Sequence, residues 1–118
     1  MVYDKERWPN FPEREISCHH CGKNEVNPEA LDKLQELRNR VGKALVINSA
    51  YRCPAHNKYV GGAKNSRHVH GDAFDISITG HNKEELLKLA QDVGFTGFGY
   101  YKHFLHVDTW NPRSWGSW

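Results

Sequence analysis

The densest group of chemically active side chains lies within residues 66–75, where two histidines and two aspartates fall inside ten positions: His68, His70, Asp72 and Asp75. A second polar group, with two histidines and an aspartate, follows at residues 103–108. Imidazole and carboxylate together suit a borderline divalent ion such as zinc, and three protein ligands with one open position are typical of a catalytic site. The two segments therefore predict one catalytic zinc site.

Strand periodicity indicates how these side chains could meet. Residues 73–79 alternate apolar and polar side chains, which predicts a strand with Asp75 on its polar face. In the last predicted strand, His106 and Asp108 are two residues apart and therefore project from the same face. If the two strands are neighbours, Asp75 and His106 share one surface, which His68 reaches from the preceding loop. We therefore expect three zinc ligands, His68, Asp75 and His106, with an open fourth position for water.

A zinc site of this kind suits hydrolysis of an amide bond, because the metal lowers the pKa of water and polarises a carbonyl. The reaction also needs a general base and a cation for the developing negative charge. Asp108 is the favoured base because it shares the metal-side face of its strand, although it could instead orient a ligand or replace His106. His103 is the rival candidate, since imidazole is a competent base near neutral pH.

Helices and short strands alternate without the regular pattern of a doubly wound fold. Helix signals, with Asn27 and Asn82 as caps and glycines as stops, predict helices at 28–41, 54–60 and 83–93. Strands are predicted at 45–49, 73–79, 97–101 and 104–109. We expect a single α+β domain over residues 1–118, with a small, mostly antiparallel sheet and about three helices. Residues 1–27 form an irregular arm in this interpretation, and 110–118 a short tail.

Composition excludes several classes of protein. The net charge is +2 and the basic residues are scattered, which argues against nucleic-acid binding. No apolar run approaches the roughly 20 residues of a membrane-spanning helix. The N-terminal segment lacks the apolar stretch of a secretory signal. We therefore expect a monomer that is made in the cytoplasm and does not insert into membranes.

Three cysteines are an odd number, so they cannot form a complete set of disulfides. Cys18 and Cys21 have the spacing of a metal knuckle. A structural metal site would need two further ligands, for which only Cys53 and a histidine such as His56 are available. Reduced, partly buried thiols in a loop are the favoured interpretation.

The ligand motif resembles a known family. The pattern Ser66-x-His68-x-x-Gly71-x-Ala73-x-Asp75, followed by His106-x-Asp108, is similar to that of the zinc D-Ala-D-Ala carboxypeptidase group. That group includes VanY-like carboxypeptidases, phage endolysin peptidases and murein endopeptidases, and it shares its metal site with the hedgehog signalling domain. Residues 49–57, 61–63, 97–101 and 112–115 also resemble it, so the similarity extends from about residue 28 to 115.

The resemblance implies a fold of the hedgehog and D-Ala-D-Ala-peptidase type, with one catalytic zinc ion on His68, Asp75 and His106. It also implies that Arg52 steadies the substrate carbonyl or carboxylate, for which a surface salt bridge is the alternative. Several relatives carry an acidic residue where this sequence has His103, so the identity of the base stays open.

The function implied is a zinc metallopeptidase that hydrolyses an amide bond in the peptide stem of bacterial peptidoglycan. It would be a D,D-carboxypeptidase or an L-Ala–D-Glu endopeptidase, of the type of a phage endolysin that reaches the wall after release during host lysis. One alternative is a non-catalytic zinc-binding module of the same fold that binds cell-wall peptides. Another is a zinc-knuckle adaptor built on Cys18 and Cys21.

Overall fold

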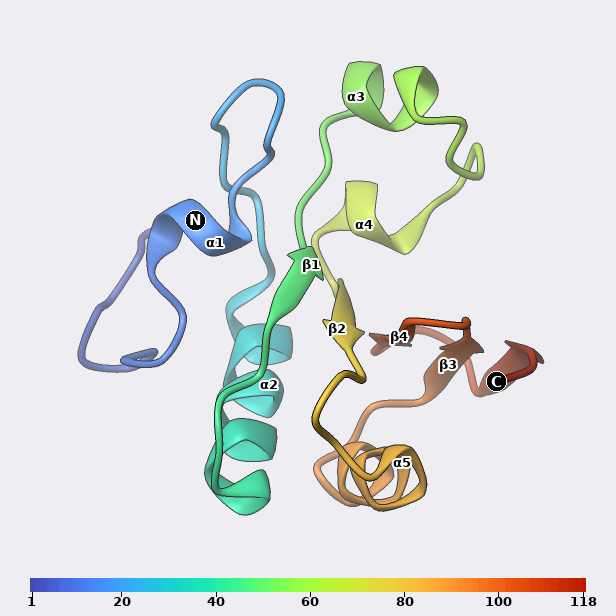
Figure 1. Ribbon diagram of the computed structural model, residues 1–118. Helices are drawn as coiled ribbons and strands as arrows, with labels where there is room; N and C mark the ends of the chain where they lie inside the picture. The colour runs from blue at the N-terminus through green and yellow to red at the C-terminus, as the bar shows by residue number, and fades with distance from the viewer.

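The computed structural model describes all residues, 1–118, and has the expected α+β class (Figure 1). Its helices are α1 (Glu13–Ile16), α2 (Pro28–Val41), α3 (Pro54–Tyr59), α4 (Arg67–His70) and α5 (Lys83–Asp92). Its strands are β1 (Ile47–Ser49), β2 (Ala73–Ser77), β3 (Gly97–Tyr100), β4 (Phe104–Asp108) and β5 (Arg113–Gly116). The three longest helices, α2, α3 and α5, are those predicted, and α1 and α4 are single turns.

The two long helices begin and end where the sequence signals them. The side chain of Asn27 accepts hydrogen bonds from the backbone N–H groups of Glu29 and Ala30, and Gly42 ends α2 in the left-handed conformation. Asn82 caps α5 in the same way by accepting from the N–H of Glu85. The two helices contact each other beside the sheet (Figure 1).

The sheet has five strands in the order β1-β2-β4-β3-β5. Every neighbouring pair is antiparallel except β3 and β5, which are parallel, so the sheet is mixed. The segment expected to be a C-terminal tail therefore contributes an edge strand. This strand, β5, is hydrogen-bonded to β3, and the backbone N–H of Arg113 also donates to the carbonyl of Thr96.

One face of the sheet packs into the hydrophobic core. The apolar side chains of the two central strands, Phe74, Ile76, Leu105 and Val107, are fully buried there. The intervening residues of β2 and β4 point to the opposite face, as the alternation predicts. That opposite face carries Asp75 from the first polar segment and His106 and Asp108 from the second.

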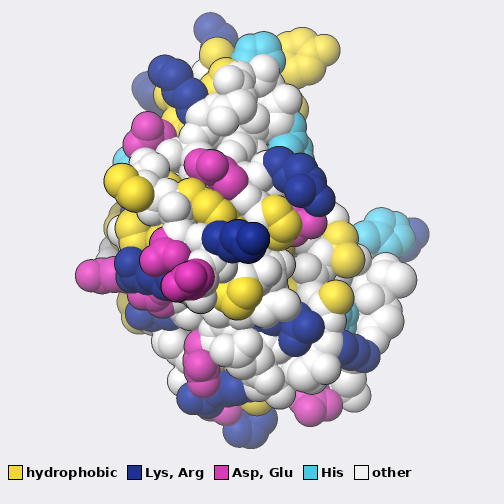
Figure 2. All heavy atoms as spheres, turned by 90° about the vertical axis from the view of Figure 1, so that its left-hand side faces the viewer, with side chains coloured by type: hydrophobic (Ala, Val, Ile, Leu, Met, Phe, Trp, Pro, Cys, Tyr) yellow, Lys and Arg dark blue, Asp and Glu magenta, His cyan; other side chains and the backbone are white.

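The N-terminal arm is anchored by large apolar side chains. Trp8, Phe11 and Ile16 are almost completely buried, and the indole N–H of Trp8 donates to Asp32 of α2. On this side of the molecule, acidic and basic side chains are intermixed (Figure 2). No helix is both long and apolar enough to cross a membrane.

Candidate active site

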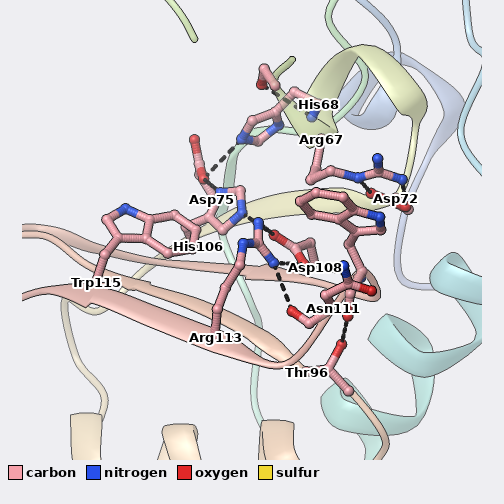
Figure 3. Close-up of polar contacts among 12 residues, drawn as sticks. Arg67, His68, Asp72, Asp75, Thr96, His106, Asp108, Asn111, Arg113 and Trp115 are labelled. Carbon is pink, nitrogen blue, oxygen red and sulfur yellow. Dashed lines mark hydrogen bonds and ion pairs between the residues drawn. The ribbon is translucent and has the colours of Figure 1, made fainter.

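Two of the predicted ligands face each other across neighbouring strands. Asp75 of β2 is paired in register with His106 of β4. The Oδ1 atom of Asp75 lies 3.1 Å from Nδ1 of His106 and 3.1 Å from Nε2 of His68 (Figure 3). All three side chains are buried, with exposed fractions of 4–8%. The structure thus brings together the three residues predicted as zinc ligands.

His68 reaches this point because α4 is only one turn long. Ser66 caps the turn by accepting a hydrogen bond from the backbone N–H of His68 (3.2 Å). Gly71 ends it with φ of +80°, and a Cβ atom there would lie 2.1 Å from the carbonyl oxygen of Glu25. Glycine therefore provides both the positive φ and the close approach that turn the chain into β2.

Each histidine is held through its other ring nitrogen. Nδ1 of His68 lies 2.7 Å from the carbonyl oxygen of Ala50, and Nε2 of His106 lies 2.7 Å from Oδ2 of Asp108. Because a carbonyl or carboxylate oxygen only accepts, these nitrogens must carry the protons. Such outer contacts fix the tautomer and orientation of metal-binding histidines.

This arrangement leaves lone pairs pointing at one another. In the neutral form that binds metals, with their outer nitrogens protonated, the rings of His68 and His106 present unprotonated nitrogens to the carboxylate of Asp75. Three acceptors converging in a buried site repel each other unless a cation lies between them. The donor set and the convergence therefore fit a metal ion.

The spacing also fits a tetrahedral ion. The three ligand atoms lie within 4.8 Å of one another. A tetrahedral zinc with bonds of about 2.0–2.1 Å to nitrogen and oxygen separates its ligand atoms by about 3.3 Å. The observed separation of 3.1 Å from Asp75 to each histidine is close to that value, so little movement is needed to bind a metal.

Asp108 lies behind His106 and is completely buried. Its two oxygens each accept a hydrogen bond from Arg113, at 2.9 and 2.8 Å (Figure 3). Burial acts to raise the pKa of Asp108, but the bonds to His106 and Arg113 outweigh it and hold the pKa well below its usual range. A carboxylate so occupied is a poor proton acceptor, which speaks against the role of general base favoured from the sequence and supports a positioning role.

Space for this ion pair comes from β3. A Cβ atom on Gly97 would lie 2.1 Å from Oδ1 of Asp108 and 2.2 Å from a guanidinium nitrogen of Arg113. Only glycine at this position leaves room for both side chains. The pair therefore depends on three strands: β3, β4 and β5.

His103 lies on the exposed turn between β3 and β4. Its side chain does not line the cavity beside the metal ligands, although Tyr101 and Phe104 on either side of it do. The structure therefore places the second candidate base at the rim of the site, where its ring is open to water.

The ligands open into a cavity of about 410 Å³. Besides His68, Asp75 and His106, its lining includes three arginines and three aromatic residues: Arg52, Arg67, Arg113, Tyr101, Phe104 and Trp115. Arg67 and Arg113 are paired with Asp72 and Asp108, respectively.

Arg52 is the cavity arginine without a carboxylate partner. Its guanidinium donates only to neutral oxygens, Oδ1 of Asn57 at 2.9 Å and Oγ of Ser49 at 3.3 Å. The salt bridge considered as its alternative role does not form. A Cβ atom on Gly62 would lie 2.8 Å from this guanidinium, so glycine also keeps space for it.

Several site residues were not identified from the sequence. Arg113 and Tyr101 line the cavity, and the hydroxyl of Tyr101 accepts a hydrogen bond from the indole N–H of Trp115 (2.9 Å), a residue whose position in the sequence did suggest the edge of the site. Asp72 is buried and paired with Arg67, which the sequence likewise did not predict. An arginine five residues away is the only local signal for that pair.

Comparisons with known proteins point to one family. The family model described as peptidase M15 matches residues 9–108. The zinc D-Ala-D-Ala carboxypeptidase of Streptomyces albus G is 36% identical over 91 residues, which cover 72% of this chain and 36% of that protein. The peptidoglycan L,D-endopeptidase MepK of Escherichia coli K12 is 32% identical over 99 residues, which cover 76% of this chain and 54% of that protein.

The chain thus spans about a third of the length of the first relative and about half of the second. The family model matches most of this chain, and the matched residues include all three candidate ligands, Arg52 and the whole of β2, β3 and β4. On the strength of that match, the chain belongs to the peptidase M15 family.

Proposed function

We propose that this protein is a zinc peptidase that hydrolyses an amide bond in the peptide stem of bacterial peptidoglycan. The observation that carries the proposal is the convergence of His68, Asp75 and His106 beside a cavity that also contains an unpaired arginine. The names of the two relatives, a carboxypeptidase for D-Ala-D-Ala and an endopeptidase for peptidoglycan, support this substrate class.

Residues around the metal site orient its ligands and shield them from water. A bound zinc ion supplies Lewis acidity, which lowers the pKa of water and polarises a carbonyl. The carbonyl of Ala50 and the carboxylate of Asp108 hold the two imidazoles in their ligand tautomers. Burial of all three ligands keeps competing solvent away and strengthens their hold on a cation.

Arg52 is the residue that we expect to bind the substrate carboxylate or the developing oxyanion. Its charge has no acidic partner, so a substrate anion meets no competitor. Replacement by alanine should lower kcat/KM by roughly 10²–10³-fold, the effect of losing one preorganised donor, while zinc content stays unchanged. Steady-state kinetics on a synthetic stem peptide would measure this.

The matched control for Arg52 is Arg40→Ala on α2. Arg40 forms an exposed ion pair with Glu36, and such pairs contribute little. Its removal should leave kcat/KM within experimental error. Equal activity of Arg52→Ala and Arg40→Ala would contradict the assigned role of Arg52.

We assign the general base to His103 and a positioning role to Asp108. His103 is exposed at the rim of the cavity, whereas Asp108 is buried between His106 and Arg113. His103→Ala should lower kcat by roughly 10²-fold or more with zinc retained. Asp108→Asn should instead weaken zinc binding by roughly 10–100-fold, because it loosens His106.

Parallel measurement of kcat and zinc affinity in both variants separates these two roles. A variant at His103 with normal kcat would exclude it as the base. Loss of kcat in Asp108→Asn at saturating zinc, with unchanged zinc affinity, would restore Asp108 as the base.

The proposal extends to the phage endolysin type, with synthesis in the cytoplasm and access to the wall after release during lysis. A net charge of +2 and a calculated isoelectric point of about 8.5 favour approach to an anionic wall polymer. The bond cut is either the terminal D-Ala-D-Ala bond or the L-Ala–D-Glu bond.

Release of new amino groups from purified peptidoglycan by the zinc-loaded protein tests the enzymatic proposal. Cosedimentation of the protein with the same material measures binding independently. Binding without release of amino groups would favour the alternative, a non-catalytic module for cell-wall peptides.

A further inference from the structure

A second cluster of metal-binding side chains lies away from the cavity. The three sulfur atoms of Cys18, Cys21 and Cys53 lie within 4.8 Å of one another, although Cys53 is distant in sequence. None of them forms a disulfide. Tetrahedral zinc with Zn–S bonds of about 2.3 Å separates its sulfur ligands by about 3.8 Å. No two of the three sulfurs are therefore more than about 1 Å farther apart than a zinc ion requires.

The first two cysteines lie on a tight turn. The backbone N–H of Gly22 donates to the carbonyl of Cys18, and the N–H of Cys18 donates to the carbonyl of Lys23, both at 2.8 Å. Gly22 has φ of +76°, a conformation that residues with side chains rarely adopt. The Cys-x-x-Cys-Gly segment thus closes a small loop that presents both sulfurs on the same side.

The third cysteine meets this loop at the start of α3. Figure 1 shows the loop of the N-terminal arm rising beside α3, and the backbone N–H of Cys53 donates to the sulfur of Cys18 (3.4 Å). The sulfur of Cys53 in turn accepts from the N–H of His56 (3.4 Å). Amide groups directed at sulfur stabilise the thiolate, which is the form that binds zinc.

The candidate for a fourth ligand is His56, three residues after Cys53. The Nδ1 atom of His56 is buried and has no hydrogen-bond partner, and it is the one buried side-chain nitrogen or oxygen in the chain in this condition. Buried polar atoms nearly always have a hydrogen-bond partner, so we expect this nitrogen to bind a group that the protein itself does not supply. The ring of His56 also stacks on that of His20, at 5.6 Å between centroids and an interplanar angle of 7°.

We propose that Cys18, Cys21, Cys53 and His56 bind a second, structural zinc ion. The pairs Cys-x-x-Cys and Cys-x-x-His match the ligand spacing and the Cys₃His composition of structural zinc sites. This ion links the N-terminal arm to the start of α3, directly after Arg52, and so holds the segment that carries the cavity arginine. It replaces the expectation of reduced thiols, and it does not depend on the proposed peptidase activity.

Metal analysis and cobalt substitution test this site. The zinc-loaded wild-type protein should contain two zinc ions per chain, and His68→Ala should retain one. The cobalt form should show thiolate-to-cobalt charge-transfer absorption, which the ligands His68, Asp75 and His106 cannot produce. This absorption should persist in His68→Ala, so that a failure of the peptidase proposal leaves it unaffected.

Variants of the cluster should separate ligands from neighbours. Cys21 is exposed, so Cys21→Ser should fold and yet lose the charge-transfer absorption and one zinc per chain. His56→Ala should shift the cobalt spectrum and weaken zinc binding at this site. His19→Ala, the matched control between the two cysteines, should leave the spectrum and the two zinc ions unchanged.

Three outcomes would overturn the proposal. One is a single zinc per wild-type chain with no thiolate absorption in the cobalt form. Another is a disulfide between Cys18 and Cys53, detected by mass spectrometry of the unreduced protein. The third is an unchanged spectrum and zinc affinity in His56→Ala, which would remove His56 from the ligand set.

Discussion

His68→Ala should abolish amide-bond hydrolysis and remove one equivalent of zinc, whereas His70→Ala should leave both unchanged. The two histidines are two residues apart on α4, but His68 is buried against Asp75 and His70 is exposed. Loss of a ligand removes the activation of water by the metal, so we expect a fall in activity of roughly 10³-fold or more.

Zinc analysis and kinetics on the same preparations measure this prediction. Circular dichroism checks that His68→Ala remains folded, since the bond from His68 to the carbonyl of Ala50 is also lost. The contrast with His70→Ala matters because both variants remove one imidazole from the same turn. Full activity in His68→Ala, or an equal loss in both variants, would contradict the ligand assignment.

Arg113→Met should lower the free energy of unfolding by about 3 kcal/mol, because it leaves the buried carboxylate of Asp108 without its cation. Breaking a buried ion pair typically costs about 3–5 kcal/mol. The lower figure applies here because the Arg113 side chain is 30% exposed and water can partly replace it. Urea denaturation at saturating zinc measures the change.

Two further variants identify the cause. In Arg113→Met/Asp108→Asn the uncompensated charge is gone, so most of the lost stability should return while zinc affinity stays low. Arg40→Met breaks an exposed pair with Glu36 and should cost less than about 1 kcal/mol. An equally small cost for Arg113→Met would contradict the account of this pair.

The difference in unfolding free energy between wild type and Arg113→Met should depend on pH, because the pKa of Asp108 is lowered in the folded protein. A carboxyl group with a lowered folded-state pKa contributes stability above its unfolded pKa of about 3.9, and that contribution is lost as the pH falls toward the folded value. The gap between wild type and Arg113→Met should therefore be full near neutral pH and shrink in acid. A gap that widens in acid would exclude the ion pair as its cause.

The ligand set was predictable because its geometry follows from local periodicity. Asp75 and His106 each occupy a polar position in an alternation of apolar and polar residues. This alternation places both on the polar face of a strand, whichever strands pair. The in-register pairing of these two residues confirms that β2 and β4 are neighbours. The helix caps Asn27 and Asn82 were predictable for the same reason, since capping depends on residues only two or three positions away.

The role of Asp108 was not predictable in this way. Periodicity places it on the same face as His106, but its partner Arg113 belongs to a strand whose pairing with β3 has no local signal. That strand contains glycine and serine and follows a proline, a pattern that indicates a tail. Its structure comes from tertiary hydrogen bonds, and only these show that Asp108 is already paired.

The same limit applies to the cysteine cluster. The spacing of Cys18 and Cys21 was visible in the sequence, but the approach of Cys53 depends on how the N-terminal arm packs beside α3. The buried, unpartnered nitrogen of His56 is likewise a property of the folded chain. Long-range packing therefore changes the interpretation of these thiols.

The central claim is that the zinc-loaded site cuts an amide bond of the peptidoglycan stem, and mass spectrometry of digested muropeptides tests it most directly. We predict products that have gained one water, either with a released terminal D-Ala or with a new amino group on D-Glu, and their absence with His68→Ala. Unchanged muropeptides after incubation with wild-type protein that holds zinc on His68, Asp75 and His106 would contradict the account.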